Sequence, residues 1–259
     1  MMGANVGENG LYLDLSARPG PDTFILVSVH GVHRRAQEHL DAFGPPIRAM
    51  GGCLCTPLFA RDRFPDYQRL GRPGRGLRAD LALLDALRQR LHACGLAGAK
   101  IHLFGHSGGG QFVHRFVMAH PESVASYALS APGWYTFPDE GIAYPKGLAA
   151  PPPGIAALQP DRFLRVPGCV FVGANDTRHG PTLRRQEDID CQQGGTRLER
   201  ARRWVNAMNR SAVERGLQEP LRIYELAGAG HSFQGLVRRA HLQDKVLHFL
   251  TQHTGEAAC

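Results

Sequence analysis

Lysine is scarce in this chain, and its basic residues are never concentrated in one block. The 259 residues carry a formal net charge of +7, yet only Lys100, Lys146 and Lys245 are lysines, and the arginines lie singly or in scattered pairs. Proteins that bind nucleic acid concentrate basic residues in a run, a stripe or a tail. We therefore expect a solvated basic surface and no nucleic-acid partner.

The six cysteines lack the spacing of a metal or redox site. They stand at positions 53, 55, 94, 169, 191 and 259, so none forms a C-x-x-C pair. No set of histidines and carboxylates has metal-ligand spacing either. The sequence therefore predicts no metal and no cofactor.

Long apolar runs are also missing. No stretch reaches the ~20 residues that a membrane-spanning helix needs, and residues 1–10 have neither the charged nor the apolar region of a signal peptide. We expect no membrane span and a cytoplasmic location. The chain is long enough to bury a large core as one domain of residues 1–259, and its oligomeric state stays open.

Segments typical of strands and helices alternate along the chain. Strands are predicted at residues 11–15, 24–29, 53–59, 101–104, 124–129, 169–172 and 221–226, and helices at residues 35–50, 78–94, 108–120, 196–215 and 235–251. Pro45-Pro46 are expected to end the first helix. This alternation predicts an α/β protein with a mostly parallel central sheet and helices on both faces.

Ser107 lies in the most informative stretch, Gly105-His-Ser-Gly-Gly109. An apolar strand precedes this G-x-S-x-G motif and an amphipathic helix follows it, which is the context that a nucleophile elbow requires. Such a turn exposes the serine hydroxyl and directs the first N–H groups of the helix toward a ligand. The alternative interpretation is an ordinary Gly/Ser turn.

An acid and a base follow two later strands. In a parallel sheet, reactive groups lie just past the carboxyl ends of the strands. Asp176 follows the strand at 169–172, and His231 follows the strand at 221–226. A serine needs such a histidine as base, held by a buried acceptor. Asp176 also suits a tight turn, and Asp188 and Asp190 are the alternative acids.

These residues resemble the α/β-hydrolase superfamily over nearly the whole chain. The resemblance rests on His30-Gly31, Gly105-His-Ser-Gly-Gly109, Gly173-Ala-Asn-Asp176 and Gly230-His231, in the order Ser, Asp, His. It implies the α/β-hydrolase fold and hydrolysis of carboxylic esters or related acyl compounds. By the same resemblance, Val32 is the second oxyanion donor beside the N–H of Gly108, with His33 as the alternative.

Residues 132–167 interrupt the alternation with many prolines and glycines, at a place where this fold commonly carries a lid. We expect a short irregular lid there. Trp134 and Tyr135 are predicted to bind substrate, with packing in the core as the alternative, and His106 is expected to shape the pocket floor. In the loop at 61–76, a solvated surface is favoured over anion binding by Arg61, Arg63 and Tyr67.

The predicted function is therefore hydrolysis of a small-molecule ester through an acyl-enzyme on Ser107. Amide hydrolysis and acyl transfer use the same triad and stay open. A non-catalytic binding protein on the same scaffold is the alternative from another class. An intact Ser107, Asp176 and His231 set counts against it.

Overall fold

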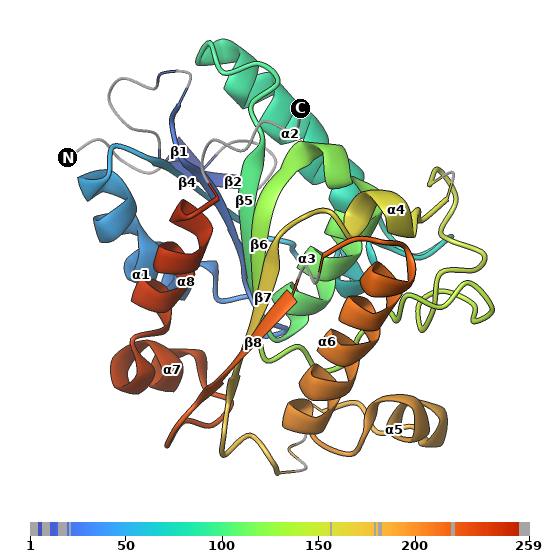
Figure 1. The fold of residues 1–259 in the computed structure, drawn as a ribbon. Helices are drawn as coiled ribbons and strands as arrows, with labels where there is room; N and C mark the ends of the chain where they lie inside the picture. The colour runs from blue at the N-terminus through green and yellow to red at the C-terminus, as the bar shows by residue number, and fades with distance from the viewer. Residues whose placement is uncertain are drawn as a thin grey trace.

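A single eight-stranded sheet forms the centre of the molecule (Figure 1). The structure is a computed structural model that describes residues 20, 22–155, 157–178, 180, 183–218 and 221–253, together with the backbone of residues 5–6 and 11–14. Cys259 and most of residues 1–10, where a signal peptide was not expected, lie outside the described residues.

The strands run in the order β1-β2-β4-β3-β5-β6-β7-β8. Six of them, β3 to β8, are parallel, while β1 and β2 add an antiparallel edge next to β4. Their bounds are β1 Asn5–Val6, β2 Leu11–Asp14, β3 Ile25–Val29, β4 Cys53–Pro57, β5 Ile101–His106, β6 Val124–Ser130, β7 Gly168–Gly173 and β8 Leu221–Leu226. The predicted fold class is confirmed.

Helices cover both faces of the sheet because alternate side chains of the central strands are apolar on each side. In β3, Ile25, Val27 and Val29 belong to one core cluster, whereas Leu26 belongs to the other. The first cluster includes residues of α2, α3 and α6, and the second includes residues of α1, α7 and α8 on the opposite side (Figure 1). The helices are α1 Ala36–Ala49, α2 Ala79–Ala93, α3 Gly108–Ala119, α4 Pro160–Phe163, α5 Glu187–Gln193, α6 Arg197–Glu214, α7 Phe233–Ala240 and α8 Leu242–Thr251, with short 3₁₀ turns η1 Tyr67–Arg69 and η2 Pro121–Ser123.

Two helix boundaries differ from the prediction. Helix α1 continues through Pro45 and Pro46, since Phe43 and Ile47 on either side of them are buried and hold the helix against the sheet. The predicted final helix is two helices, because the backbone of His241 adopts φ +50, a left-handed conformation that ends α7 before α8 begins. Helices α4 and α5 were not predicted.

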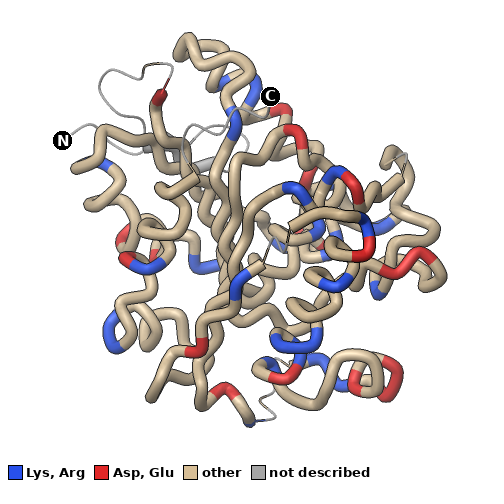
Figure 2. Tube along the Cα trace, in the orientation of Figure 1, with Lys and Arg blue, Asp and Glu red and all other residues tan. Residues whose placement is uncertain are grey.

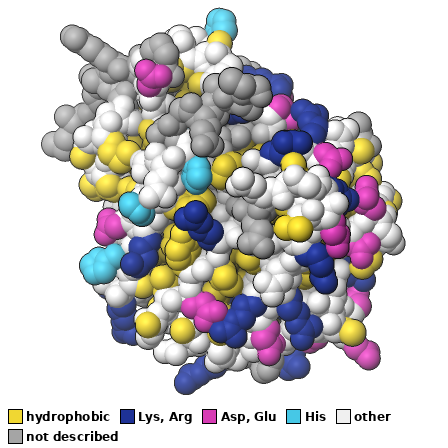
Figure 3. All heavy atoms as spheres, viewed as in Figure 1, with side chains coloured by type: hydrophobic (Ala, Val, Ile, Leu, Met, Phe, Trp, Pro, Cys, Tyr) yellow, Lys and Arg dark blue, Asp and Glu magenta, His cyan; other side chains and the backbone are white. Residues whose placement is uncertain are grey.

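The expectation of a solvated basic surface holds only in part, because Arg115, Arg197 and Arg200 are buried. Lys and Arg residues are interspersed with Asp and Glu along the trace (Figure 2), and the face in Figure 3 likewise carries both signs of charge. Among the described residues, no helix has the length and apolarity that crossing a bilayer would require.

Candidate active site

Ser107 occupies the tight turn between β5 and α3. Its backbone lies at φ +54 and ψ −111, a conformation that costs energy in any residue with a side chain. The flanking glycines allow the strand and the helix to approach: a Cβ on Gly105 would lie 2.3 Å from the Gly109 carbonyl oxygen, and one on Gly109 would lie 2.0 Å from that of Val29. The turn therefore depends on both glycines of the motif.

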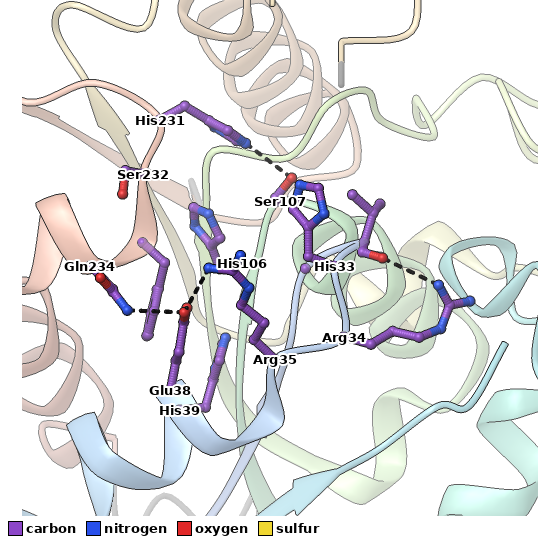
Figure 4. Close-up of a pocket in the computed structure, with 13 residues that line it drawn as sticks. His33, Arg34, Arg35, Glu38, His39, His106, Ser107, His231, Ser232 and Gln234 are labelled. Carbon is purple, nitrogen blue, oxygen red and sulfur yellow. Dashed lines mark hydrogen bonds and ion pairs between the residues drawn. The ribbon is translucent and has the colours of Figure 1, made fainter. Parts of the chain in front are cut away.

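Two hydrogen bonds connect Ser107, His231 and Asp176. The Oγ of Ser107 lies 3.2 Å from Nε2 of His231, and Nδ1 of His231 lies 3.0 Å from Oδ2 of Asp176 (Figure 4 shows the first contact). Ser107 and Asp176 are buried, while the His231 side chain is 27% exposed. The arrangement has the geometry that a serine nucleophile, a partly exposed base and a buried acceptor for that base require.

The alternative acids lie elsewhere. Asp188 is exposed and pairs with Lys146 at 2.7 Å, and Asp190 pairs with Arg200. Of the three predicted candidates, only Asp176 hydrogen-bonds to His231. Its second oxygen, Oδ1, lies 3.3 Å from Nη1 of Arg197, a contact that the sequence did not predict.

Val32 and His33 form the centre of a turn beside the serine. The turn closes through a hydrogen bond from the Arg34 N–H to the Gly31 carbonyl at 2.9 Å. A Cβ on Gly108 would lie 3.1 Å from the backbone nitrogen of Val32, so the two predicted oxyanion donors are close together. Within the described part of the chain, neither of these N–H groups has a protein acceptor.

Arg34 and Tyr67 hold this turn in place, and the sequence did not predict this role for either residue. The Arg34 guanidinium donates to the carbonyls of Val32, Phe59 and Phe64, at 3.2, 2.6 and 3.3 Å. The Tyr67 hydroxyl donates to the His30 carbonyl at 2.9 Å. Tyr67 is fully buried, so it is neither solvated nor accessible to an anion, and both expectations for this residue are wrong. An arginine three residues after His-Gly was the signal available in the sequence.

A cavity of about 230 Å³ opens beside Ser107. Its walls come from the turn after β3, the start of α1, His106 and the loop before α7, and they include charged and polar groups (Figure 4). Across one side, Glu38 accepts hydrogen bonds from Arg35 and Gln234, both at 3.0 Å. The cavity can therefore receive a small or narrow acyl group beside the hydroxyl.

His106 lines this cavity, as expected for its floor. Its Nδ1 lies 3.1 Å from the Ser130 hydroxyl, and its ring centroid lies 5.1 Å from that of His231. Burial, followed by the nearby His231, holds the pKa of His106 well below its usual value. His106 is therefore a neutral wall of the cavity.

The structure does not place Trp134 or Tyr135 among the residues that line this cavity. Packing in the core, the alternative interpretation, describes Tyr135. Tyr135 is fully buried and stacks on Trp204 with ring centroids 4.7 Å apart. Its backbone pairs with the Gln193 side chain. Trp134 is 4% exposed and is surrounded by arginines. Contacts with distant segments bury the residues after β6, and composition alone does not reveal those contacts.

No protein-family model matches the chain, and no curated protein sequence matches it. Solved structures do resemble it. Poly(aspartic acid) hydrolase-1 from Sphingomonas sp. KT-1 is 25% identical with a TM-score of 0.76, over 91% of this chain and 92% of that chain. LpqC, a poly(3-hydroxybutyrate) depolymerase from Bordetella parapertussis, is 27% identical with a TM-score of 0.74, over 96% of this chain and 85% of that chain. The thermophilic esterase Est2 from Thermogutta terrifontis, at 17% identity and a TM-score of 0.55 over 93% and 85% of the two chains, shares the fold.

Proposed function

We propose that this chain, which has the α/β-hydrolase fold, is a serine hydrolase that cleaves a carboxylic ester through an acyl-enzyme. The observation that carries the proposal is the pair of hydrogen bonds from Ser107 to His231 and from His231 to Asp176. These three groups lie at the carboxyl edge of the sheet, beside a cavity.

Each group has a defined role in the proposed reaction. The Oγ of Ser107 attacks the ester carbonyl carbon while Nε2 of His231 takes the hydroxyl proton. The negative oxygen of the tetrahedral intermediate accepts hydrogen bonds from the N–H groups of Gly108 and Val32. His231 then gives its proton to the departing alkoxide, and the C–O bond breaks. Water then attacks the acyl carbon while Nε2 of His231 takes its proton, the bond between the acyl carbon and the Ser107 oxygen breaks, and His231 gives the proton to that oxygen as the carboxylic acid leaves.

The comparisons support an acyl substrate. Poly(3-hydroxybutyrate) is a polyester and poly(aspartic acid) is a polyamide, so the two similar proteins are named for different bond types. An ester is proposed here, with an amide substrate or acyl transfer as the alternatives on the same triad. The cytoplasmic location also stays a prediction; the five described cysteines are free thiols, as a reducing compartment leaves them.

The test compares p-nitrophenyl esters with the matching p-nitroanilides, for the wild-type protein and Ser107→Ala. We expect hydrolysis of the esters, little turnover of the anilides, and loss of nearly all ester turnover in Ser107→Ala. A fluorophosphonate probe should label the wild-type protein on Ser107 and leave the variant unlabelled. A label on another serine, or an active Ser107→Ala, contradicts the proposal, and an unlabelled, inactive wild type favours a binding protein.

A further inference from the structure

Three guanidinium groups surround the ring of Trp134. Their Cζ atoms lie 5.2 Å (Arg69), 4.3 Å (Arg115) and 5.6 Å (Arg184) from the ring centroid. They come from three separate places: η1 after β4, helix α3, and the segment between β7 and α5. Because each of these segments follows a strand of the parallel sheet, the cluster forms where loops at the carboxyl edge converge.

The positive charge of this cluster is not balanced by carboxylates. In the described residues, none of the three arginines has an Asp or Glu oxygen within 4.0 Å, whereas Arg197 and Arg200 each have an aspartate partner. Packing against an indole ring is favourable for a single cation. Gathering three like charges without a counterion is unfavourable, since their mutual repulsion is uncompensated.

Arg115 adds a buried charge to this cluster. Its side chain is fully buried, its Nε donates to Thr136, and its Nη1 donates to the carbonyls of Gln68 and Gln111. Its Nη2 is buried without a hydrogen-bond partner. Burial lowers the pKa of Arg115 to about 10, as expected for a cation that no carboxylate stabilises.

The cluster is connected to the nucleophile through helix α3. Gln111 lies one turn from the serine, with its backbone nitrogen 3.1 Å from the Ser107 carbonyl oxygen, and Arg115 lies one turn further. Arg115 comes eight residues after Ser107, and eight residues of α-helix span ~12 Å, so we place the cluster on the order of 12 Å from the nucleophile. The outer members are accessible, because Arg184 is exposed and Arg69 is half-buried.

We propose that Arg69 and Arg184, with Arg115 behind them, form a subsite for a carboxylate that the substrate carries away from its scissile bond. The inference rests on the proposed hydrolase function and narrows its substrate class to anionic acyl compounds. The two accessible guanidinium groups, each with its Cζ atom within 5.6 Å of the Trp134 ring centroid, can bind a carboxylate. The buried charge of Arg115 adds attraction without direct contact.

The test uses two sets of esters, in which each carboxylate ester is compared with the matching neutral carboxamide. In the first set the carboxylate is on the acyl chain: the esters are p-nitrophenyl monoesters of dicarboxylic acids from glutaric to sebacic acid. In the second set the carboxylate is on the alcohol: the esters are the butyrate esters of 8-hydroxyoctanoic acid and of its carboxamide. In one of the two sets we expect kcat/KM for the carboxylate ester to exceed that for the carboxamide by about tenfold at low salt, the size of one hydrogen bond to a charged group. This preference should fall at high salt.

Arg69→Gln and Arg184→Gln, singly and together, should remove the preference and leave kcat/KM for the neutral partner within about twofold. Arg185→Gln is the control, since Arg185 is also exposed but faces Asp190 at 3.8 Å. No preference in either pair, or a preference that survives in the double variant, overturns the subsite. If the wild-type protein does not hydrolyse the neutral esters, the proposed function is contradicted, and the binding measurement then tests the subsite.

A binding measurement further separates a failure of the subsite from a failure of the proposed function. In Ser107→Ala, titration with the most preferred anion should change the fluorescence of the protein, whose two tryptophans include Trp134. The carboxamide should cause no comparable change, and Arg69→Gln/Arg184→Gln in the same background should abolish the response. A response to the anion that is equal in this variant overturns the inference, even if the protein hydrolyses no ester.

Discussion

Arg197 donates to the Oδ1 of Asp176 at 3.3 Å, and both side chains are buried. Arg197 is the first residue of α6, where a capping box between Thr196 and Glu199 fixes the start of the helix. The helix end therefore places a cation behind the proposed catalytic carboxylate, whose other oxygen faces His231. Burial of a carboxylate without such a partner is unfavourable.

Replacing Arg197 by methionine should destabilise the protein. The variant leaves a buried carboxylate without its cation, and breaking a buried pair in this way costs about 3–5 kcal/mol of the free energy of unfolding. Urea denaturation followed by circular dichroism measures the change. Arg202→Met is the control, because Arg202 and Glu225 pair at the surface and such pairs contribute under about 1 kcal/mol. Equal losses in both variants would contradict the role given to Arg197.

Asp176→Asn should reduce kcat by about 10⁴, since an amide no longer holds His231 in the tautomer that accepts the Ser107 proton; the magnitude is that of the corresponding change in serine proteases. Steady-state kinetics with a p-nitrophenyl ester give the result. Asp188→Asn and Asp190→Asn should keep activity, because these carboxylates pair with Lys146 and Arg200 instead. A larger loss in either of them than in Asp176→Asn would show that another residue is the acid.

Gly108→Ala should reduce kcat by about 10²–10³, the effect of losing one oxyanion donor. The added Cβ would lie 2.7 Å from the Tyr67 hydroxyl and 3.1 Å from the Val32 nitrogen, so it displaces the turn that carries the second donor. Gly44→Ala is the matched control in helix α1, where the new Cβ meets only the flexible end of Arg48, at 3.6 Å. An unchanged kcat in Gly108→Ala would show that the oxyanion does not bind at the N–H groups of Gly108 and Val32.

The sequence predicted the residues that local chemistry determines. The strand, the turn and the helix around Ser107 follow from neighbouring residues, and Asp176 and His231 follow from the rule that loops after parallel strands share one edge. The structure confirms the sheet and brings the three side chains together. Their catalytic roles stay proposals.

The remaining features depend on contacts between distant segments. Helix α1 passes through Pro45 and Pro46 because the sheet buries Phe43 and Ile47 beside them, and no local pattern contains that packing. The burial of Tyr135 likewise comes from Trp204, which lies far along the chain in α6. Arginines were assigned to the surface by their charge, although Arg115 and Arg197 are buried. Tertiary context decides such positions.

Buried histidines other than the proposed catalytic residue should make the fold sensitive to acid. Burial lowers the pKa of His30 to about 4, that of His39 to about 3 and that of His102 to about 4. Each stays neutral in the folded protein between its lowered pKa and the unfolded value near ~6.5, while the unfolded chain binds a proton there. The free energy of unfolding should therefore fall as pH decreases from about 6.5 to 4, and it should be unaffected by these groups above about pH 7.5.

His102→Gln tests this dependence away from the proposed active site. His102 stacks on Phe24 with centroids 4.3 Å apart and hydrogen-bonds to Ser126 at 2.8 Å, contacts that a glutamine amide replaces in part. Between pH 6 and 4.5, the slope of the free energy of unfolding against pH should be smaller in the variant by up to about 1.4 kcal/mol per pH unit, which is the contribution of one proton. Urea denaturation at half-unit pH steps measures the slope for both proteins. His248→Gln is the control, since His248 is exposed on α8. A slope that is the same in the wild type and in His102→Gln would show that His102 titrates alike in the folded and unfolded states.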